Sequence, residues 1–331
     1  MKLLNESPAN DQLSAAAATV ASATDLVDQP DPGLTKAVAV EPQVNDFLEL
    51  DLPNELYLAI DKLGFTTSTA IQKEVLPYSL DGRDIIAQAQ TGTGKTAAFL
   101  ISVITYHLEH PEYDPRPAGT PFALVIAPTR ELVMQIAEDA MSLSLFTDLS
   151  VLSVVGGMDY EKQKNQLKGP IDIIIATPGR LLDFCRTGVI NLSRVETLVI
   201  DEADRMLSMG FIPDVKSIIS KTPAKQKRQT QLFSATFSDD IKRLAASWTL
   251  DPVRIEVAPD QVAVDSVEQL VYLASADQKF AVLYNLLQLD TVDRVIIFAN
   301  RRDETRSLES RLYRHGIDSG LLSGEVVQTK R

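Results

Sequence analysis

Cysteine is nearly absent from this chain of 331 residues, and Cys185 is its single thiol. One cysteine excludes a disulfide framework and any zinc site built from several cysteines. A reducing, cytoplasmic setting is therefore the simplest expectation. Histidine is also scarce: His107 and His110 lie on a stretch with helical spacing, and His315 ends another. No Cys or acidic partner is suitably spaced from these side chains, so we interpret them as surface or capping residues.

The chain also lacks a long apolar run and an excess of positive charge. No segment of about 18 consecutive apolar residues is present, which argues against a transmembrane helix. The N-terminus is not typical of a signal peptide, because Lys2 is its only early positive charge and Glu6 and Asp11 precede an alanine-rich stretch. The formal net charge of -13 argues against a nucleic-acid partner, since neutralising phosphates takes Lys and Arg. Net charge is a coarse measure, however, and the local placement of charges decides this point.

Residues 1–45 are rich in Ala, Asp, Pro and Ser and contain few large apolar side chains. Such a segment cannot bury enough surface to offset its ordering entropy, so we expect a disordered acidic tail. From residue 50 onward, apolar residues at helical spacing are followed by short apolar runs that alternate with amphipathic stretches. The runs lie at 84–89, 122–127, 150–155, 171–176, 197–201 and 229–233. Because each run is continuously apolar, both faces of each strand are covered, and the pattern predicts an α/β fold with a parallel sheet between helices.

The pattern breaks after Val257, and residues 258–266 indicate a linker between a first domain at 46–257 and a second at 267–331. In the second domain the sequence predicts strands at 267–274, 294–298 and 319–322 and helices at 277–289 and 302–315. About 65 residues is thin for an α/β domain, because so few strands leave sheet edges and faces uncovered. We therefore expect the second domain to be incomplete.

Two motifs that follow predicted strands carry the chemistry of a nucleotide-hydrolysing site. Residues 89–96 read Ala-Gln-Thr-Gly-Thr-Gly-Lys-Thr. Glycines there let the backbone wrap phosphate oxygens, a lysine can bind the β/γ-phosphates, and a threonine hydroxyl can hold Mg²⁺. Residues 201–204 read Asp-Glu-Ala-Asp, which supplies one carboxylate for the metal and another for the attacking water. Both motifs in one chain predict a site that binds and hydrolyses a nucleoside triphosphate.

These motifs, together with Ser234-Ala235-Thr236, resemble motifs I, II and III of the DEAD-box RNA helicases. The resemblance covers about residues 45–331 and implies a RecA-like first domain followed by part of a second one. It implies that Thr96 and Asp201 hold Mg²⁺ and that Glu202 activates the water. It also implies that Asp204, bonded to Ser234 and Thr236, couples the nucleotide state to RNA binding. The residues implied to bind the phosphates are Gly92, Thr93, Gly94, Lys95 and Thr96.

Residues 65–72, with Phe47 upstream, resemble the Q motif of the same family. The resemblance implies that Gln72 reads the edge of adenine, that Phe47 stacks on its ring, and that ATP is preferred over GTP. Ser68 stands where the family usually has proline. We expect this departure to affect the rigidity of the loop more than its contacts with the base.

Three further motifs, at 128–132, 156–157 and 177–180, resemble the family's contacts with single-stranded RNA. Hydroxyls, glycine N–H groups and a guanidinium at strand ends can hold phosphates without reading bases. Such contacts need few charges, which reconciles an RNA partner with the acidic composition. The residues implied to contact RNA are Pro128, Thr129, Arg130, Gly156, Gly157, Thr177, Pro178, Gly179 and Arg180.

Residues 295–300 resemble motif IV, and Gln328 and Arg331 match a Q-x-x-R element that implies a further RNA contact. The stretches 296–300 and 321–328 are similar to bacterial degradosome-associated RhlB-type helicases, which implies a ribonuclease or other RNA-processing assembly as a partner. Motifs V and VI, the latter carrying the family's arginine fingers, have no counterpart in the sequence.

The expected activity is ATP-dependent unwinding or remodelling of short RNA duplexes, with ATP and Mg²⁺ as ligands. One alternative is a nucleotide-dependent RNA-binding module with little turnover, for which the missing arginine-finger segment is the reason. Another is a DNA helicase or translocase, which the Q motif and residues 177–180 disfavour.

Overall fold

The structure is a computed structural model that describes residues 46–111, 116–257, 268, 270–289, 294–324 and 326. The expected tail at 1–45 and the expected linker at 258–266 lie outside these residues. Within the described ranges, no helix is long and apolar enough to cross a membrane.

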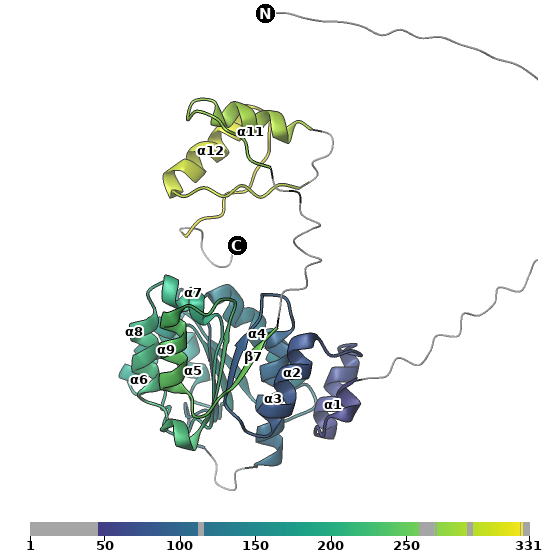
Figure 1. Cartoon of the computed structure of the whole chain (residues 1–331). Coiled ribbons are helices and arrows are strands. Elements are labelled where there is room, and N and C mark those ends of the chain that lie inside the picture. Colours follow the sequence, from purple (N-terminus) through teal and green to yellow (C-terminus); the bar gives the residue numbers. More distant parts are fainter. Residues whose placement is uncertain are drawn as a thin grey trace, which may run out of the picture. The chain divides into compact units, whose positions relative to one another are not determined.

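A wholly parallel, seven-stranded sheet forms the centre of the region between residues 46 and 257 (Figure 1). Its strands lie in the order β3-β4-β2-β5-β6-β1-β7. This confirms the predicted parallel α/β fold. The strands are β1 (Ile85–Gln88), β2 (Ala123–Ile126), β3 (Val151–Val154), β4 (Ile173–Ala176), β5 (Thr197–Ile200), β6 (Gln229–Ser234) and β7 (Val253–Glu256).

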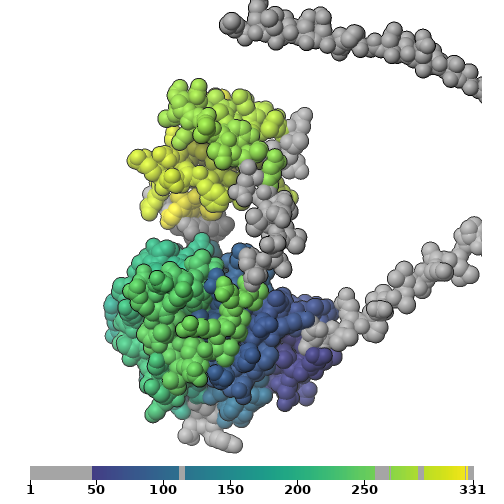
Figure 2. All heavy atoms as spheres, in the orientation of Figure 1, coloured from purple at the N-terminus to yellow at the C-terminus, as the bar shows by residue number. Residues whose placement is uncertain are grey.

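Helices cover both faces of this sheet (Figure 1). One face carries η1 (Asp46–Glu49), α1 (Asn54–Lys62), α2 (Ala70–Leu80), α3 (Lys95–Glu109) and α4 (Arg130–Leu143). The other carries α5 (Tyr160–Gln166), α6 (Pro178–Arg186), α7 (Ala203–Ser208), α8 (Ile212–Ile219) and α9 (Asp239–Trp248), with η2 (Lys225–Lys227) leading into β6. In Figure 2 the side chains of the teal and green segments form a continuous surface over this second face.

Successive residues of each strand pack on opposite faces, as the period of two in a strand requires. Ile85 and Ala87 belong to the core beneath α1–α4, whereas Ile86 belongs to the core beneath α5–α9. In β2, Val125 and Leu124 divide in the same way. Because both positions are apolar, the strand sequences are continuously apolar, which is the signal that predicted a covered parallel sheet.

Helices begin directly after strands at residues that satisfy the first N–H groups of the helix. The Thr129 side chain accepts a hydrogen bond from Leu132 N at 3.2 Å and caps α4. Pro178 opens α6 at a position where its missing N–H is no loss. These caps place the start of each helix, and the loop before it, at the carboxyl edge of the sheet.

The structure contains one strand that the sequence analysis did not predict. The edge strand β7 pairs in parallel with β1, and Ile255 is buried while Arg254 and Glu256 are exposed. This alternation spans only four residues and differs from the continuous apolar runs of the inner strands. An edge strand has one neighbour and a solvated side, so its sequence carries a weaker signal.

The described residues beyond 267 contain two helices, α11 (Lys279–Leu287) and α12 (Arg302–Arg314), in agreement with the two helices predicted there. Aromatic and cationic side chains join them. The guanidinium carbon of Arg311 lies 3.9 Å from the ring centroid of Phe280, and the His315 ring lies 5.0 Å from the same ring. The two helices therefore pack on each other at one end.

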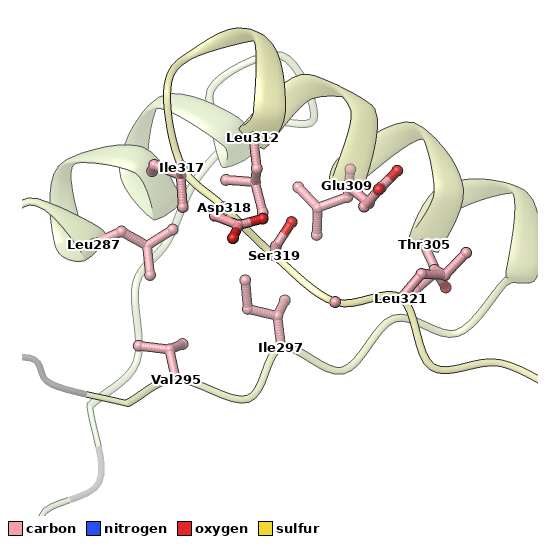
Figure 3. Close-up of a pocket in the computed structure, with 12 residues that line it drawn as sticks. Leu287, Val295, Ile297, Thr305, Glu309, Leu312, Ile317, Asp318, Ser319 and Leu321 are labelled. Carbon is pink, nitrogen blue, oxygen red and sulfur yellow. The ribbon is translucent and has the colours of Figure 1, made fainter. Parts of the chain in front are cut away.

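The three strands predicted in this second region are wrong for the residues that the structure describes: 270–274, 294–298 and 319–322 have no strand assignment. Residues 270–273 are all exposed, and 294–298 alternate only in part, because Val295 is itself 46% exposed. Val295 and Ile297 line a pocket of about 390 Å³ beside Leu312, whereas Ile296 and Phe298 are 81% and 91% exposed (Figure 3). A strand requires a hydrogen-bonded neighbour, and apolar alternation alone does not supply one.

Candidate functional site

The motif residues gather at the carboxyl edge of the sheet, because parallel strands all end at the same edge. The phosphate-loop motif follows β1, residues 201–204 follow β5, and residues 234–236 close β6. These three strands are neighbours in the order β5-β6-β1. The sheet therefore brings together three motifs that lie far apart in the sequence.

The phosphate loop turns sharply into α3 through two glycines with positive φ. Gly92 has φ 84° and Gly94, the N-cap of α3, has φ 92°. At Gly94 a β-carbon would lie 2.7 Å from Gln72 Nε2, so a larger residue does not fit there. The loop thus presents backbone N–H groups at a helix N-terminus, which is the arrangement that binds phosphate.

Lys95, the first residue of α3, points back into the loop. Its Nζ donates a hydrogen bond to the Ala89 carbonyl at 2.8 Å, and the residue is only 6% exposed. A buried ammonium is costly unless it is hydrogen-bonded or lies near a carboxylate, and the Ala89 carbonyl and the nearby Asp201 meet part of that need. Binding a phosphate would require Lys95 to exchange this carbonyl for a phosphate oxygen.

Gln72 lines a pocket that also contains the phosphate loop. Both ends of its side-chain amide already form hydrogen bonds within the protein. Its Oε1 accepts a hydrogen bond from Thr69 N at 2.9 Å, which completes a capping box at the start of α2. Its Nε2 donates to the Gly94 carbonyl at 3.1 Å. Gln72 therefore ties the residue 65–72 loop to the phosphate loop, a contact that the sequence analysis did not anticipate.

The expectation for Phe47 needs correction. Its side chain is 0% exposed and belongs to the core, with its ring centroid 6.4 Å from that of Phe65. A buried ring cannot stack on a base. The aromatic side chain that lines the pocket is Phe65, and Phe47 packs behind it. Sequence alone could not rank the two rings, because a buried and an exposed phenylalanine have the same letter.

Asp201 is the last residue before the turn after β5, and it is 3% exposed. Burial raises the pKa of its carboxyl group to about 6, although the nearby Lys95 and a hydrogen bond from Glu202 N act in the opposite direction. A buried carboxylate with this raised pKa lacks sufficient positive charge around it. It is a fitting ligand for a divalent cation, which favours the ionised form.

Glu202 occupies the left-handed region of the backbone, with φ 51° and ψ 51°. Among the described residues other than glycine, only Glu202 and Asp251 have positive φ. Such a conformation costs roughly 1–3 kcal/mol and persists only where the surrounding structure enforces it. Glu202 lines the same pocket as the buried Asp201 that precedes it.

Asp204 joins the turn after β5 to the end of β6, as the sequence resemblance implied. Its Oδ2 accepts hydrogen bonds from Thr236 N at 3.0 Å and Thr236 Oγ1 at 2.9 Å. Its backbone N donates to Ser234 Oγ at 3.2 Å, and that hydroxyl donates to the Thr236 carbonyl. Burial acts to raise the pKa of Asp204, but the hydrogen-bonding groups around its carboxylate, led by the Thr236 side chain, together outweigh it, and the pKa lies below its usual value.

A pocket of about 420 Å³ is lined by Gln72, the phosphate loop, Asp201 and Glu202, together with a wall that the sequence analysis missed. That wall is one face of α4, formed by Gln135, Asp139 and Ser142. Burial, and then the neighbouring Glu138, raise the pKa of Asp139. The spacing of 135, 139 and 142 places them on one side of a helix, but nothing in the sequence says that this side faces the phosphate loop.

The motifs proposed to contact RNA lie at the other end of the same sheet edge. They follow β2, β3 and β4, which are neighbours in the order β3-β4-β2. Arg130, the first residue of α4, lies against the turn after β3: a β-carbon at Gly157 would fall 2.0 Å from Arg130 Nη1. Only glycine allows the guanidinium to approach this closely. Pro128 is buried, Thr129 caps α4, and Gly157 is exposed.

The turn into α6 carries the second arginine of this edge. The guanidinium carbon of Arg180 lies 5.3 Å from the ring centroid of Tyr160 and 5.7 Å from that of Phe184. Arg180 also donates to the Met158 carbonyl at 3.4 Å. These contacts fix the guanidinium beside the turn after β3. Thr177 is the N-cap of α6, Pro178 is buried, and Gly179 is exposed.

The remaining predicted RNA contacts, Gln328 and Arg331, lie outside the described residues. Apart from the buried Phe47, the other predicted site residues form two groups along one edge, one beside β5-β6-β1 and one beside β3-β4-β2. Strands β2 and β5 are neighbours, so the two groups adjoin.

The residues of the first group fit a magnesium-bound nucleoside triphosphate. Within the described ranges, no group of three or more His, Cys, Asp or Glu side chains could hold a metal ion alone. Mg²⁺ at nucleotide sites is usually held by one or two protein ligands together with phosphate oxygens and water, and Thr96 and Asp201 match that pattern.

Comparison with known proteins agrees with this geometry. A family model described as DEAD/DEAH box helicase matches residues 69–244. The chain belongs to the DEAD/DEAH box helicase family. The matched segment includes the phosphate loop and residues 128–132, 156–157, 177–180, 201–204 and 234–236.

Individual relatives in this family are similar over most of the chain. It is 53% identical over 295 residues to the ATP-dependent RNA helicase RhlB of Pseudomonas aeruginosa (strain UCBPP-PA14), which covers 88% of this chain and 74% of that protein. The RhlB of Shewanella amazonensis is 40% identical over 285 residues, covering 86% of this chain and 65% of that protein. A DEAD box protein crystal structure from the hyperthermophile Methanococcus jannaschii superposes with a TM-score of 0.58 at 32% identity, covering 86% and 74% of the two chains. The DEAD-box fold with its RecA-like parallel sheet is thus shared.

Proposed function

We propose that this DEAD-box family member couples ATP binding and hydrolysis to the binding and local unwinding of duplex RNA. The proposal rests on the hydrogen bonds of Asp204. This residue lies in the first turn of α7, directly after Asp201 and Glu202, and it bonds to Ser234 and Thr236 at the end of β6. The same sheet edge presents Arg130 and Arg180 beside the nucleotide group. RNA as the substrate is supported by the relatives, which are named ATP-dependent RNA helicases.

Each residue of the nucleotide group has a separate task in this proposal. The N–H groups of residues 92–96 and the ammonium of Lys95 bind the β/γ-phosphates. Thr96 and Asp201 would hold Mg²⁺, which when bound neutralises charge on the phosphate oxygens. Glu202 orients the attacking water and accepts its proton. Lys95 leaves the Ala89 carbonyl when the phosphates arrive, so it donates a hydrogen bond in both states.

Base recognition in this proposal uses the loop at 65–72. Gln72 has an acceptor and a donor that can pair with the amino group and ring nitrogen on the edge of adenine. To do so it must release Thr69 N and the Gly94 carbonyl. Adenine binding would thereby free the phosphate loop at Gly94. Phe65, rather than Phe47, offers the aromatic surface in the pocket.

The RNA group would bind the sugar-phosphate backbone. Arg130 and Arg180 provide guanidinium groups, and Gly157 and Gly179 are exposed so that a phosphate can approach the backbone closely. Such contacts carry little sequence information, so binding would be salt-sensitive and tolerant of base sequence.

The wider setting is also part of the proposal. We assign residues 46–257 to an ATP-binding domain, 258–266 to a linker, 267–331 to part of a second RecA-like domain and 1–45 to a tail. Residues 328 and 331 would add RNA contacts. A cytoplasmic location and an RNA-processing partner such as a ribonuclease complete the picture.

Strand displacement tests the proposed function. The purified chain is mixed with a short RNA duplex that carries a single-stranded overhang, and release of the labelled strand is followed after addition of Mg·ATP or Mg·GTP. We expect displacement with ATP, little with GTP and none with Lys95→Ala. Displacement without nucleotide, or equal rates for RNA and DNA duplexes, would contradict the proposal.

A further inference from the structure

We propose that Arg205 is a positioning residue for Glu202, the group that handles the attacking water. Arg205 Nη1 lies 3.3 Å from Glu202 Oε2, three residues away across the first turn of α7. This inference rests on the proposed ATPase function and adds a residue that the sequence motifs do not assign.

The two side chains differ greatly in exposure. The Glu202 side chain is 12% exposed, whereas that of Arg205 is 58% exposed. Glu202 therefore lies largely out of solvent and lines the pocket, whereas Arg205 is exposed and is not among the lining residues. A carboxylate shielded from water gains more from a guanidinium partner than an exposed one does, because screening is weaker.

The ion pair leaves one oxygen of Glu202 for catalysis. Arg205 engages Oε2, so Oε1 remains to accept a hydrogen bond from a water molecule. Glutamate has three rotatable side-chain bonds, and a general base must be held within hydrogen-bond reach of the proton that it accepts. A fixed Oε2 restricts where Oε1 can point.

Arg205 is in turn tied to the coupling residues. Its backbone N donates to Asp204 Oδ1 at 3.0 Å, and the other carboxylate oxygen of Asp204 accepts from Thr236. A movement of Thr236 that displaces Asp204 would thus also displace the residue that holds Glu202. Residues 234–236 are thus linked to the Glu202 carboxylate through Asp204 and Arg205, which are adjacent in the chain.

An ordinary helix-surface ion pair has the same sequence spacing, and the chain contains one that serves as a control. Arg243 and Asp240 of α9 are also three residues apart, with Nη1 and Oδ1 at 3.6 Å. Their side chains are 78% and 66% exposed. Exposed pairs of this kind contribute little to stability, and this one lies outside the residues that line the nucleotide pocket.

The test compares Arg205→Gln, Arg205→Lys and Arg243→Gln in steady-state ATP hydrolysis, with kcat and KM determined separately. We expect Arg205→Gln to lower kcat roughly 5- to 20-fold with KM for ATP within about twofold, because orientation is lost while the phosphate contacts remain. Arg205→Lys should retain most of the parent kcat, and Arg243→Gln should match the parent. Thermal unfolding of each variant confirms that the fold is kept.

Two results would overturn the inference. The first is an Arg205→Gln enzyme whose kcat equals that of the parent. The second is a lower activity of Arg205→Gln of the wrong kind: either Arg205→Lys shows the same loss of kcat, or only KM for ATP rises. Glu202→Gln, measured alongside, separates this inference from the proposed function. If Glu202→Gln hydrolyses ATP as the parent does, the proposed role of Glu202 fails and the inference fails with it. If only the Arg205 variants behave as the parent, the proposed function stands and this inference does not.

Discussion

Glu202 and Lys95 act on different parts of the reaction, so their substitutions should separate hydrolysis from binding. Glu202→Gln keeps the shape of the side chain but removes the group that accepts a proton. We expect it to bind Mg·ATP as the parent does and to hydrolyse it at least about 100-fold more slowly. Lys95→Ala should weaken binding itself. Calorimetric titration with Mg·ATP and single-turnover phosphate release measure the two effects, and a Glu202→Gln variant with normal turnover would move the proton-accepting role to another residue.

Asp201 should make the metal-free protein less stable at neutral pH. Its pKa is about 6 in the folded protein against an ordinary value of 3.8, so the folded state binds more protons than the unfolded state between these values. The free energy of unfolding therefore falls as pH rises from about 4 to about 6, and the deficit persists above that range. Asp201→Asn should remove this deficit and raise the free energy of unfolding at pH 7.5 by roughly 1–3 kcal/mol.

Urea unfolding in EDTA checks this expectation for Asp201. The gain of Asp201→Asn over the parent should be smaller at pH 5 than at pH 7.5, because the parent carboxyl is then mostly protonated. An Asn variant that is less stable than the parent at both pH values would show that the carboxylate is stabilised by its surroundings rather than strained by burial.

For single residues, the sequence predicted which functional groups are present more successfully than it predicted their hydrogen-bond partners. The spacing of glycines before Lys95, and of carboxylates after an apolar run, indicates which groups are present. It does not say that Lys95 turns back to the Ala89 carbonyl or that Gln72 bonds to Gly94. Those contacts depend on how two loops from different strands meet. Phe47 was misplaced for the same reason.

Asp84 lies directly before β1, at the opposite edge of the sheet. This carboxylate, 5% exposed, accepts hydrogen bonds from Thr230 N and from Leu250 N, both at 2.7 Å. It thereby joins the start of β1 to β6 and to the turn before β7. Burial raises the pKa of Asp84, and the two hydrogen bonds and the nearby Arg228 counter only part of that effect.

Removing Asp84 should loosen these elements together. Asp84→Ala leaves two N–H groups without an acceptor, and we expect a loss of roughly 2–4 kcal/mol in the free energy of unfolding. Asp81→Ala, an exposed neighbour at the end of α2, is the control and should change stability by less than about 0.5 kcal/mol. If both substitutions lower the free energy of unfolding equally in urea unfolding, the hydrogen bonds of Asp84 do not stabilise the fold as expected.

For the elements, the sequence predicted β1–β6 from short, mainly apolar runs, although β6 begins with the buried polar residues Gln229, Thr230 and Gln231. It missed β7, whose Arg254 and Glu256 face solvent, and it predicted strands at 294–298 and 319–322 from apolar content alone. Pairing with a neighbour is a property of two segments. A single segment's composition can favour an extended chain but cannot supply the ladder.

For the whole molecule, the hydrophobic core closes within residues 46–257. Both core clusters are built from residues between Phe47 and Ile255, and beyond 257 the one apolar side chain buried among the described residues is Leu312. We therefore expect the fragment 46–257 to unfold cooperatively when expressed alone. Its Mg·ATP binding free energy should lie within about 0.5 kcal/mol of that of the whole chain. A fragment that is unfolded by circular dichroism, or that binds no nucleotide, would show that the first domain needs residues beyond it.

The separation of the nucleotide group from the RNA group along the sheet edge is also a property of the whole molecule. The sequence placed each motif after a strand, but only the strand order β3-β4-β2-β5-β6-β1-β7 separates them into a nucleotide group and an RNA group. Strand order in a parallel sheet is set by crossover connections, and local sequence does not encode it.

The central claim is that RNA binding at the RNA group changes the rate of ATP hydrolysis at the nucleotide group. RNA-dependent ATP hydrolysis tests this coupling most directly. Phosphate release by the purified chain is measured with Mg·ATP, with and without single-stranded RNA, for the parent, Arg180→Ala and Arg186→Ala. Arg186 lies exposed at the far end of α6 and serves as the matched control. The account predicts that RNA raises the rate of the parent and of Arg186→Ala. It predicts that Arg180→Ala keeps the rate without RNA but needs a higher RNA concentration for the same stimulation. The slope of log Kd for RNA against log salt concentration should fall by about 1, because one phosphate contact is lost. A parent rate that is the same with and without RNA would contradict the account.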